Sequence, residues 1–133
     1  MRLVELITFK AGELHELVGA WWAVYHGNRI HPDMLSSYGI AVLDKGLPIA
    51  VTHIYPAITA KLAWVGFTIT DPMLSRYKAG KAIMKLMAGA EESIKALGYT
   101  VLYTGFDAPA LQKLMKRRGY HEGSYVVEQW KVV

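Results

Sequence analysis

The sequence predicts one α/β domain with a mixed (α+β) sheet, extending over residues 1–133. Three observations support this fold class. A chain of 133 residues, of which 53% are apolar, is long enough to bury one core. Neither a repeat nor a linker divides it. Strand-like and helix-like runs follow in the order β-α-(α)-β-β-β-α-β-α-β, in which a meander of strands precedes a crossover helix.

The first third of the chain is expected to hold a strand, a helix and a loop. Residues 2–9 alternate apolar and polar side chains, which is typical of a strand. The next apolar residues recur at helical spacing; they are Leu14, Leu17, Val18, Trp21 and Tyr25. Gly27 and Asn28 stop this helix, and residues 28–37 form a loop or a broken second helix.

Three strands are expected next. Residues 37–44 and 47–56 flank Lys45-Gly46, and such a short turn with glycine joins two strands into a hairpin. Residues 61–70 form the third strand. It ends at Asp71-Pro72, because a proline cannot continue a hydrogen-bonded ladder in mid-sheet.

The second half is expected to alternate helices and strands. A helix from about residue 79 to residue 97 closes at Gly98. Its apolar stripe consists of Ile83, Leu86, Met87, Ala90, Ile94 and Leu97. Residues 99–106 form a strand, and residues 108–119 form a short helix. Residues 124–133 form a final strand at a sheet edge, where it could pair with a second copy in a homodimer.

Composition excludes several classes of function. The absence of cysteine excludes disulfides, thiolate metal sites and a cysteine nucleophile, and it is consistent with the cytoplasm. His15, His26, His31 and His53 share no ligand spacing with an acid, so no metal is expected. No apolar run suits a signal peptide or a membrane span, so no membrane partner is expected. A net charge of +4 favours phosphate-bearing partners.

Residues 77–82, YKAGKA, are the strongest functional candidate. At a helix start, unpaired N–H groups and the macrodipole attract anions, and small side chains let phosphate oxygens approach. No acidic residue occurs between Asp71 and Glu91. The cations in that interval are Arg76, Lys78, Lys81 and Lys85. The alternative is that Gly80 and Ala82 only permit close packing of the helix on the sheet, with the lysines solvated.

This stretch, in this order of elements, resembles the GNAT superfamily of acetyl-CoA-dependent N-acetyltransferases. The family signature, Gln/Arg-x-x-Gly-x-Gly/Ala, lies between the fourth strand and the following helix. Gly80 and Ala82 match it, whereas Tyr77 stands where Gln or Arg is usual. Further on, Asp107 takes the place of the Asn in the family's Asn-x-x-Ala segment, and Gly119-Tyr120 takes that of its Gly-Phe pair.

The resemblance implies acetyl-CoA as co-substrate and direct attack on its thioester by an amine of a small molecule or a protein. The cofactor-binding residues it implies are Thr68, Ile69 and Thr70 for pantetheine, Tyr77, Lys78, Ala79, Gly80, Lys81 and Ala82 for the pyrophosphate, and Asp107. The residues it offers to the 3′-phosphate are Lys78, Lys81, Lys113 and Lys116.

The usual proton-handling residues of the family are missing. Members usually place a Tyr four residues before the Gly-Phe pair, where this chain has Met115, or Leu114 if counted forward from Pro109, and neither can donate a proton. Many members also place a Glu on the strand that here is residues 61–70, which lacks one. His53 is a candidate base, because a histidine titrates near neutral pH. Tyr103 is a second catalytic candidate, on the strand after the long helix. The alternatives are a sheet histidine and a packed aromatic without a catalytic role.

Two other classes of function stay open. The missing Tyr and Glu, together with Tyr77 in the signature, favour a GNAT-like fold kept as a binding or structural module, for example in a phage or mobile element. A nucleic-acid-binding domain would use the basic cluster at residues 114–123. The adjacent Glu122 favours a solvated helix end instead, so no nucleic-acid partner is expected.

Overall fold

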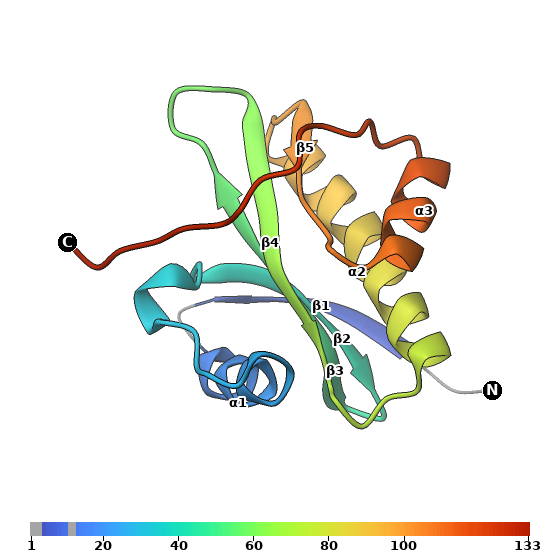
Figure 1. Ribbon diagram of the computed structural model, residues 1–133. Helices are drawn as coiled ribbons and strands as arrows, with labels where there is room; N and C mark the ends of the chain where they lie inside the picture. The colour runs from blue at the N-terminus through green and yellow to red at the C-terminus, as the bar shows by residue number, and fades with distance from the viewer. Residues whose placement is uncertain (1–3, 11–12) are drawn as a thin grey trace.

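The computed structural model describes residues 4–10 and 13–133. Within these ranges the backbone forms a five-stranded sheet in the order β1-β2-β3-β4-β5 (Figure 1). The strands are β1 (Val4–Lys10), β2 (Tyr38–Asp44), β3 (Leu47–Pro56), β4 (Leu62–Thr70) and β5 (Val101–Tyr103). Strands β1 to β4 pair antiparallel with their neighbours, whereas β5 runs parallel to β4. This confirms the predicted mixed sheet.

Helices cover both faces of the sheet (Figure 1). One face carries α1 (His15–His26), which is followed by a short 3-10 turn, η1 (Pro32–Met34). The other face carries α2 (Arg76–Ala96) and α3 (Pro109–Arg117). The strands β4 and β5 are parallel because α2 returns the chain between them, as a crossover helix does.

Alternation along the strands separates two buried clusters. On β2, Ile40 and Val42 pack in one cluster with Met87 of α2. Ala41, which lies between them, packs in the other cluster with Val18 of α1. Successive side chains of a strand point to opposite faces, so the sheet is a central layer between two helical layers.

The turn residues have the conformations that the sequence predicts. Lys45 and Gly46 have φ angles of 53° and 79°, the left-handed values that a two-residue hairpin turn requires. Gly27, with φ of 78°, closes α1 and donates its N–H to the carbonyl of Ala23. The hairpin and the end of the first helix are therefore confirmed.

Helix α2 begins earlier than predicted, at Arg76 rather than at about Ala79. The reason is Ser75, which has an extended conformation and whose Oγ accepts a hydrogen bond from the N–H of Lys78 at 3.2 Å. A serine in this place caps a helix. As a consequence, Gly80 and Ala82 lie in the second turn of α2 and not in the first.

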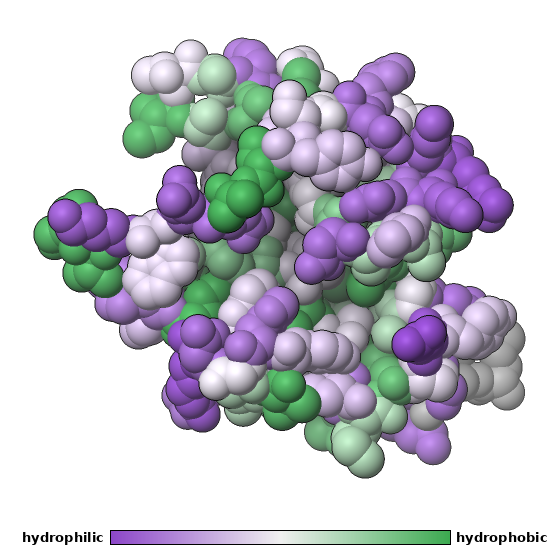
Figure 2. All heavy atoms as spheres, viewed as in Figure 1, coloured by the Kyte–Doolittle hydropathy of each residue, from purple (hydrophilic) through white to green (hydrophobic). Residues whose placement is uncertain are grey.

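The predicted strand at residues 124–133 is wrong, and β5 is shorter than the predicted strand at residues 99–106. The C-terminal segment, residues 121–133, is extended chain without regular secondary structure, and its end stands out at the left of Figure 1 with apolar atoms in Figure 2. Tyr125 is 88% exposed and Val127 is 86% exposed. Strand-like composition gives a strand only where a neighbouring edge hydrogen-bonds to it, and among the described residues no strand pairs with this segment.

The described residues include no helix with the length and apolar character needed to cross a membrane.

Candidate functional site

The sheet splits along one side of β4. Strand β5 pairs only with residues 62–64, and Thr104 Oγ1 then donates a hydrogen bond to the carbonyl of Val65 at 2.6 Å. Beyond Val65, β4 has β3 as its only neighbouring strand in the described part of the chain. Residues 66–70 therefore present a backbone edge that can pair with an extended ligand.

A β-bulge lies at the start of this open edge. The register between β3 and β4 shifts between Val51 and His53, so that Thr52 faces two residues, Phe67 and Thr68. Phe67 has a φ of 50°, a left-handed value that costs a residue with a Cβ on the order of 1 kcal/mol. Pairing of β4 with β3 continues past the bulge, but a bulge bends its strand, which accounts for β4 leaving the line of β5.

Two neighbouring side chains of β3 hold the bulge from opposite faces of the sheet. The Oγ1 atoms of Thr52 and Thr68 lie 2.7 Å apart. On the other face, His53 Nδ1 lies 3.2 Å from the carbonyl oxygen of Phe67. Thr52 and His53 are both fully buried. The bulge is therefore a fixed feature of the fold.

Burial decides the charge of His53. Desolvation is the largest effect, and with the nearby His15 it outweighs the hydrogen bonds to the backbone and lowers the pKa of His53 to about 4. The imidazole is therefore neutral at physiological pH. It lies beneath the surface, with no exposed area.

Aromatic rings cover the α1 side of the bulge. The ring of Phe67 lies 5.6 Å from that of Trp22, 6.1 Å from that of Tyr55 and 5.2 Å from that of Trp64, measured between centroids. Trp22 also stacks on His26, with centroids 4.2 Å apart. These rings are only partly buried or exposed, so the layer borders solvent beside the split.

The last residues of β4 are tied to the elements on either side. Thr70 Oγ1 lies 3.1 Å from the hydroxyl of Tyr25 in α1. The N–H of Asp71 donates to the carbonyl of Ile49 at 2.8 Å, and Asp71 Oδ1 accepts from the N–H of Met73 at 2.9 Å. Asp71 thus shapes the turn that leads from the open edge of β4 to α2.

The first turn of α2 offers free N–H groups. The N–H of Ala79 makes the first helical bond, to Ser75 O at 2.9 Å, and the Ser75 hydroxyl takes the N–H of Lys78. The N–H groups of Arg76 and Tyr77 have no intrahelical partner, as expected for this position. These groups, and not those of residues 80–82, are the ones that could meet an anion.

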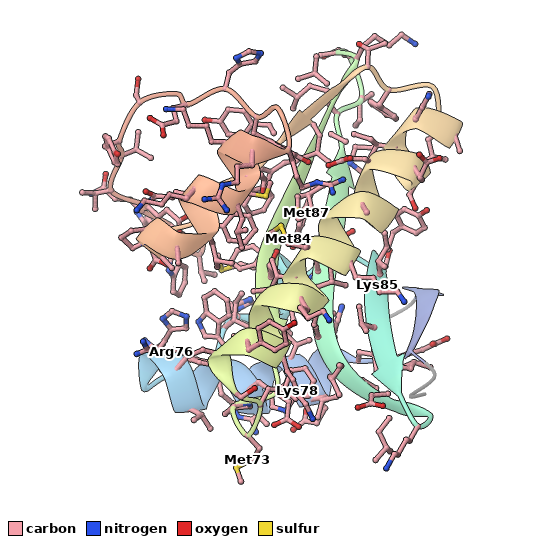
Figure 3. The ribbon with its side chains drawn as sticks, turned by 90° about the vertical axis from the view of Figure 1, so that its right-hand side faces the viewer. Met73, Arg76, Lys78, Met84, Lys85 and Met87 are labelled. Carbon is pink, nitrogen blue, oxygen red and sulfur yellow. The ribbon has the colours of Figure 1, made fainter. Side chains whose placement is uncertain are left out.

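Positive side chains surround this turn, and no acidic one occurs in it. In Figure 3 Arg76 and Lys78 project from the lower end of α2, and Met73 of the preceding loop lies below them. Lys81 Nζ lies 5.1 Å from the centroid of the Tyr77 ring. Cations at a helix N-terminus oppose the macrodipole, and a bound anion would offset that cost.

Gly80 has no packing reason to be a glycine. A Cβ added at Gly80 would meet no atom within 4 Å, and its φ is not left-handed. Ala82 differs, since it is only 5% exposed and belongs to the core between α2 and the sheet. The packing alternative therefore holds for Ala82 but not for Gly80, whose missing side chain leaves the flank of the helix open.

The predicted cofactor-binding residues other than Asp107 lie in two groups, and the remaining predicted residues lie apart from them. Thr68, Ile69 and Thr70 lie on the open edge of β4, and residues 77–82 follow on α2. Tyr103 pairs across from Trp64, at the closed end of the split, and is 58% exposed. Asp107 is exposed in the loop before α3. Met115 points into the core, only 5% exposed.

Sequence reasoning missed the residues that shape the site: Thr52, Phe67, Ser75 and Thr104. A signal existed for two of them. Gly66 inside a strand pattern indicates a bulge next to it, and Ser75 stands three residues before Lys78, at the spacing of an N-cap. Among the described residues, no group of three or more His, Asp or Glu side chains could hold a metal ion.

Neither a family model nor a curated protein matches the sequence. Solved structures do match. An aminoglycoside N-acetyltransferase in complex with CoA has a TM-score of 0.66 and 11% identity, covering 98% of this chain and 96% of that one. A GCN5-related N-acetyltransferase from Ralstonia eutropha has a TM-score of 0.65 and 15% identity, covering 96% of this chain and 99% of that one. This chain therefore has the GNAT fold of the GCN5-related N-acetyltransferases.

Proposed function

We propose that this protein is an N-acetyltransferase that transfers the acetyl group of acetyl-CoA to an amine of a small molecule or a protein. One observation carries the proposal: the open edge of β4 begins at the bulge and leads through residues 71–75 to the first turn of α2. A thioester, amides and phosphates follow in that order along acetyl-CoA. Solved structures of the same fold in complex with CoA support this proposal.

Each part of acetyl-CoA has a proposed partner. The pantetheine amides would pair with the backbone of residues 68–70 as an added strand. The pyrophosphate would meet the N–H groups of Arg76 and Tyr77, with Gly80 leaving room beside them. The proposed partners of the 3′-phosphate are Lys78, Lys81, Lys113 and Lys116. Asp107 joins this set on the family resemblance alone.

The proposed reaction is a direct acyl transfer. The neutral amine attacks the thioester carbonyl, the C–N bond forms, and the C–S bond breaks as the CoA thiolate leaves. Backbone N–H groups at the bulge would stabilise the oxyanion. The amine loses its proton to water. Tyr103, whose side chain is exposed, is the candidate residue to receive that proton. A thiolate is a fair leaving group without an acid, so the core position of Met115 does not prevent turnover.

Thermal unfolding with and without acetyl-CoA tests the cofactor. Ligand at 100 times its Kd should stabilise the fold by about 2.7 kcal/mol. Gly80→Glu should remove this shift, because it places a carboxylate on the open flank of the anion site. Ala96→Glu, with the same charge change about 24 Å along α2, should keep it. No shift for the unmodified chain at millimolar CoA would refute the cofactor proposal.

The alternative, a module that binds without turnover, is favoured by one observation: Met115, in the place of the family's Tyr, lies in the core. Release of free thiol from acetyl-CoA against a panel of amines separates the two functions. A transferase releases thiol faster with at least one amine than the uncatalysed background. Binding of CoA with background release across the panel would establish the module.

We also propose a second copy of this chain as a partner, and the cytoplasm as its compartment. The C-terminal segment and the outer edge of β5 support the homodimer, because among the described residues neither backbone has a partner on that side. In a dimer, the C-terminal segment of each copy could hydrogen-bond to the β5 edge of the other copy. A chain without cysteine needs no oxidising compartment, which supports the cytoplasm.

A further inference from the structure

His53 occupies a position that controls the bulge. It is fully buried on β3, pairs across from Gly66, and its Nδ1 lies 3.2 Å from the carbonyl oxygen of Phe67. A carbonyl oxygen only accepts hydrogen bonds, so Nδ1 carries the proton. That hydrogen bond assigns the tautomer of the neutral ring, with the proton on Nδ1 and the lone pair on Nε2.

The direction of one peptide group follows from this contact. The peptide bonds of the described chain are trans, so the carbonyl of Phe67 and the N–H of Thr68 point in opposite directions. The carbonyl turns toward the His53 ring, so the N–H of Thr68 points away from that ring. The N–H of Asp71 donates to Ile49 of β3, and backbone N–H groups alternate sides along a strand, so the N–H of Thr68 faces away from β3. That side of β4 is the open edge of the split.

The bulge needs such a restraint. Phe67 holds a left-handed φ of 50°, which a residue with a Cβ keeps only where its surroundings impose it. The Thr52–Thr68 contact restrains the second residue of the bulge, and the aromatic layer restrains the ring of Phe67. His53 is the side chain that bonds the Phe67 carbonyl itself.

We propose that His53 is a positioning residue, whose Nδ1–H holds the Phe67 carbonyl and so directs the Thr68 N–H into the split, toward the thioester oxygen. This role rests on the proposed acetyl transfer, and it replaces the role of general base that the sequence suggested for His53. A base must reach the amine, whereas His53 has no exposed surface. Its neutral ring supplies one fixed donor over the whole physiological pH range.

Nitrogen NMR of the His53 ring tests the assignment without any variant. The Nδ1–H form should persist from pH 8 to about pH 5, in agreement with the pKa of about 4. His15, whose ring centroid lies 6.0 Å away, is the titratable neighbour whose signal must be assigned separately. A proton on Nε2 with none on Nδ1 at pH 7 would overturn the proposal.

Two substitutions separate positioning from proton transfer. His53→Asn keeps an N–H donor near the place of Nδ1, whereas His53→Leu removes it. The Leu variant should shift the backbone amide signals of Phe67 and Thr68 and lower kcat about 10- to 100-fold. The Asn variant should keep the amide signals of Phe67 and Thr68 in place, and its kcat should stay within about threefold of the original value. His15→Leu, which loses a bond to Ser36 instead, is the matched control and should leave the bulge signals in place.

Two outcomes decide against the positioning role. If Asn loses as much kcat as Leu while the Phe67 and Thr68 signals stay in place, His53 itself moves a proton. If Leu leaves those signals unchanged, the bulge does not depend on His53. A chain that binds no acetyl-CoA refutes the proposed transfer instead, and the ring tautomer and the bulge signals then still decide whether His53 holds the bulge.

Discussion

Gly66 is the residue that makes room for the bulge. A Cβ at this position would overlap the indole ring of Trp64, three atoms of which would lie 2.2–2.6 Å from it. The same ring contacts Tyr55 and Phe67, with centroids at 4.8 Å and 5.2 Å. The absent side chain of Gly66 is therefore what allows Trp64 to reach Phe67 and support its left-handed conformation.

Gly66→Ala should destabilise the fold by about 1–3 kcal/mol, because Trp64 must leave its place in a packed layer. Chemical denaturation measures this loss. Gly123→Ala is the matched control, since a Cβ there meets no atom within 4 Å. It should change the free energy of unfolding by less than about 0.5 kcal/mol. Equal effects of the two substitutions would show that the Trp64 layer does not depend on Gly66.

At the scale of elements, one polar cluster joins the end of α3 to the C-terminal part of α2. Arg118 contacts Glu91 with two hydrogen bonds, of 2.6 Å and 3.2 Å, and the Tyr120 hydroxyl donates to Glu91 at 2.7 Å. Burial alone would raise the pKa of Glu91, but the bonds from Arg118 and Tyr120 outweigh it and lower this pKa. The cluster fixes the segment that follows α3.

Glu91→Gln should cost about 1 kcal/mol at pH 7, a value reduced by solvent because the Glu91 side chain is 36% exposed. A carboxyl with a lowered folded pKa stabilises above its unfolded pKa, near 4.3, and this gain is lost as pH falls through the folded value. The difference between the two proteins should therefore shrink below about pH 4.

Urea unfolding across pH 3 to 7 checks this, with Glu92→Gln as the control. Glu92 is the exposed neighbour of Glu91 on α2, and its substitution makes the same change of charge. A loss for Glu91→Gln that stays constant down to pH 3 would mean that the carboxylate charge contributes nothing to the link between the helices.

Local chemistry made most elements predictable, and tertiary partners decided the rest. The Lys45-Gly46 turn and the apolar stripe of α2 are encoded within a few residues, and both are found. The small residues from Ala79 to Ala82 predict a helix start near Ala79, whereas the Ser75 cap, which is also a local signal, sets the start at Arg76. Gly66 is a local sign of a bulge in this strand, but the conformation of Phe67 depends on Thr52 and His53, which lie on another strand and which no local pattern reveals.

At the scale of the whole molecule, the layered fold follows from the order of elements, whereas the C-terminal segment does not. Its apolar side chains predicted a strand, and the structure leaves residues 121–133 without one. The sheet ends at β5, where Val101 is 50% exposed. A short open edge and an unpaired extended segment on the same chain are complementary, and exposed apolar surface of this kind favours association.

A homodimer in which each C-terminal segment pairs with the β5 edge of the other copy should form as concentration rises. Sedimentation velocity should show monomer giving way to dimer. Val127→Lys should weaken this association at least tenfold, because it puts a charge into the exchanged segment. Val24→Lys makes the same change on α1, at a valine that is 68% exposed, and should leave association unaltered. A monomer at all accessible concentrations, or equal weakening by both substitutions, would mean that the C-terminal segment is not the contact between copies.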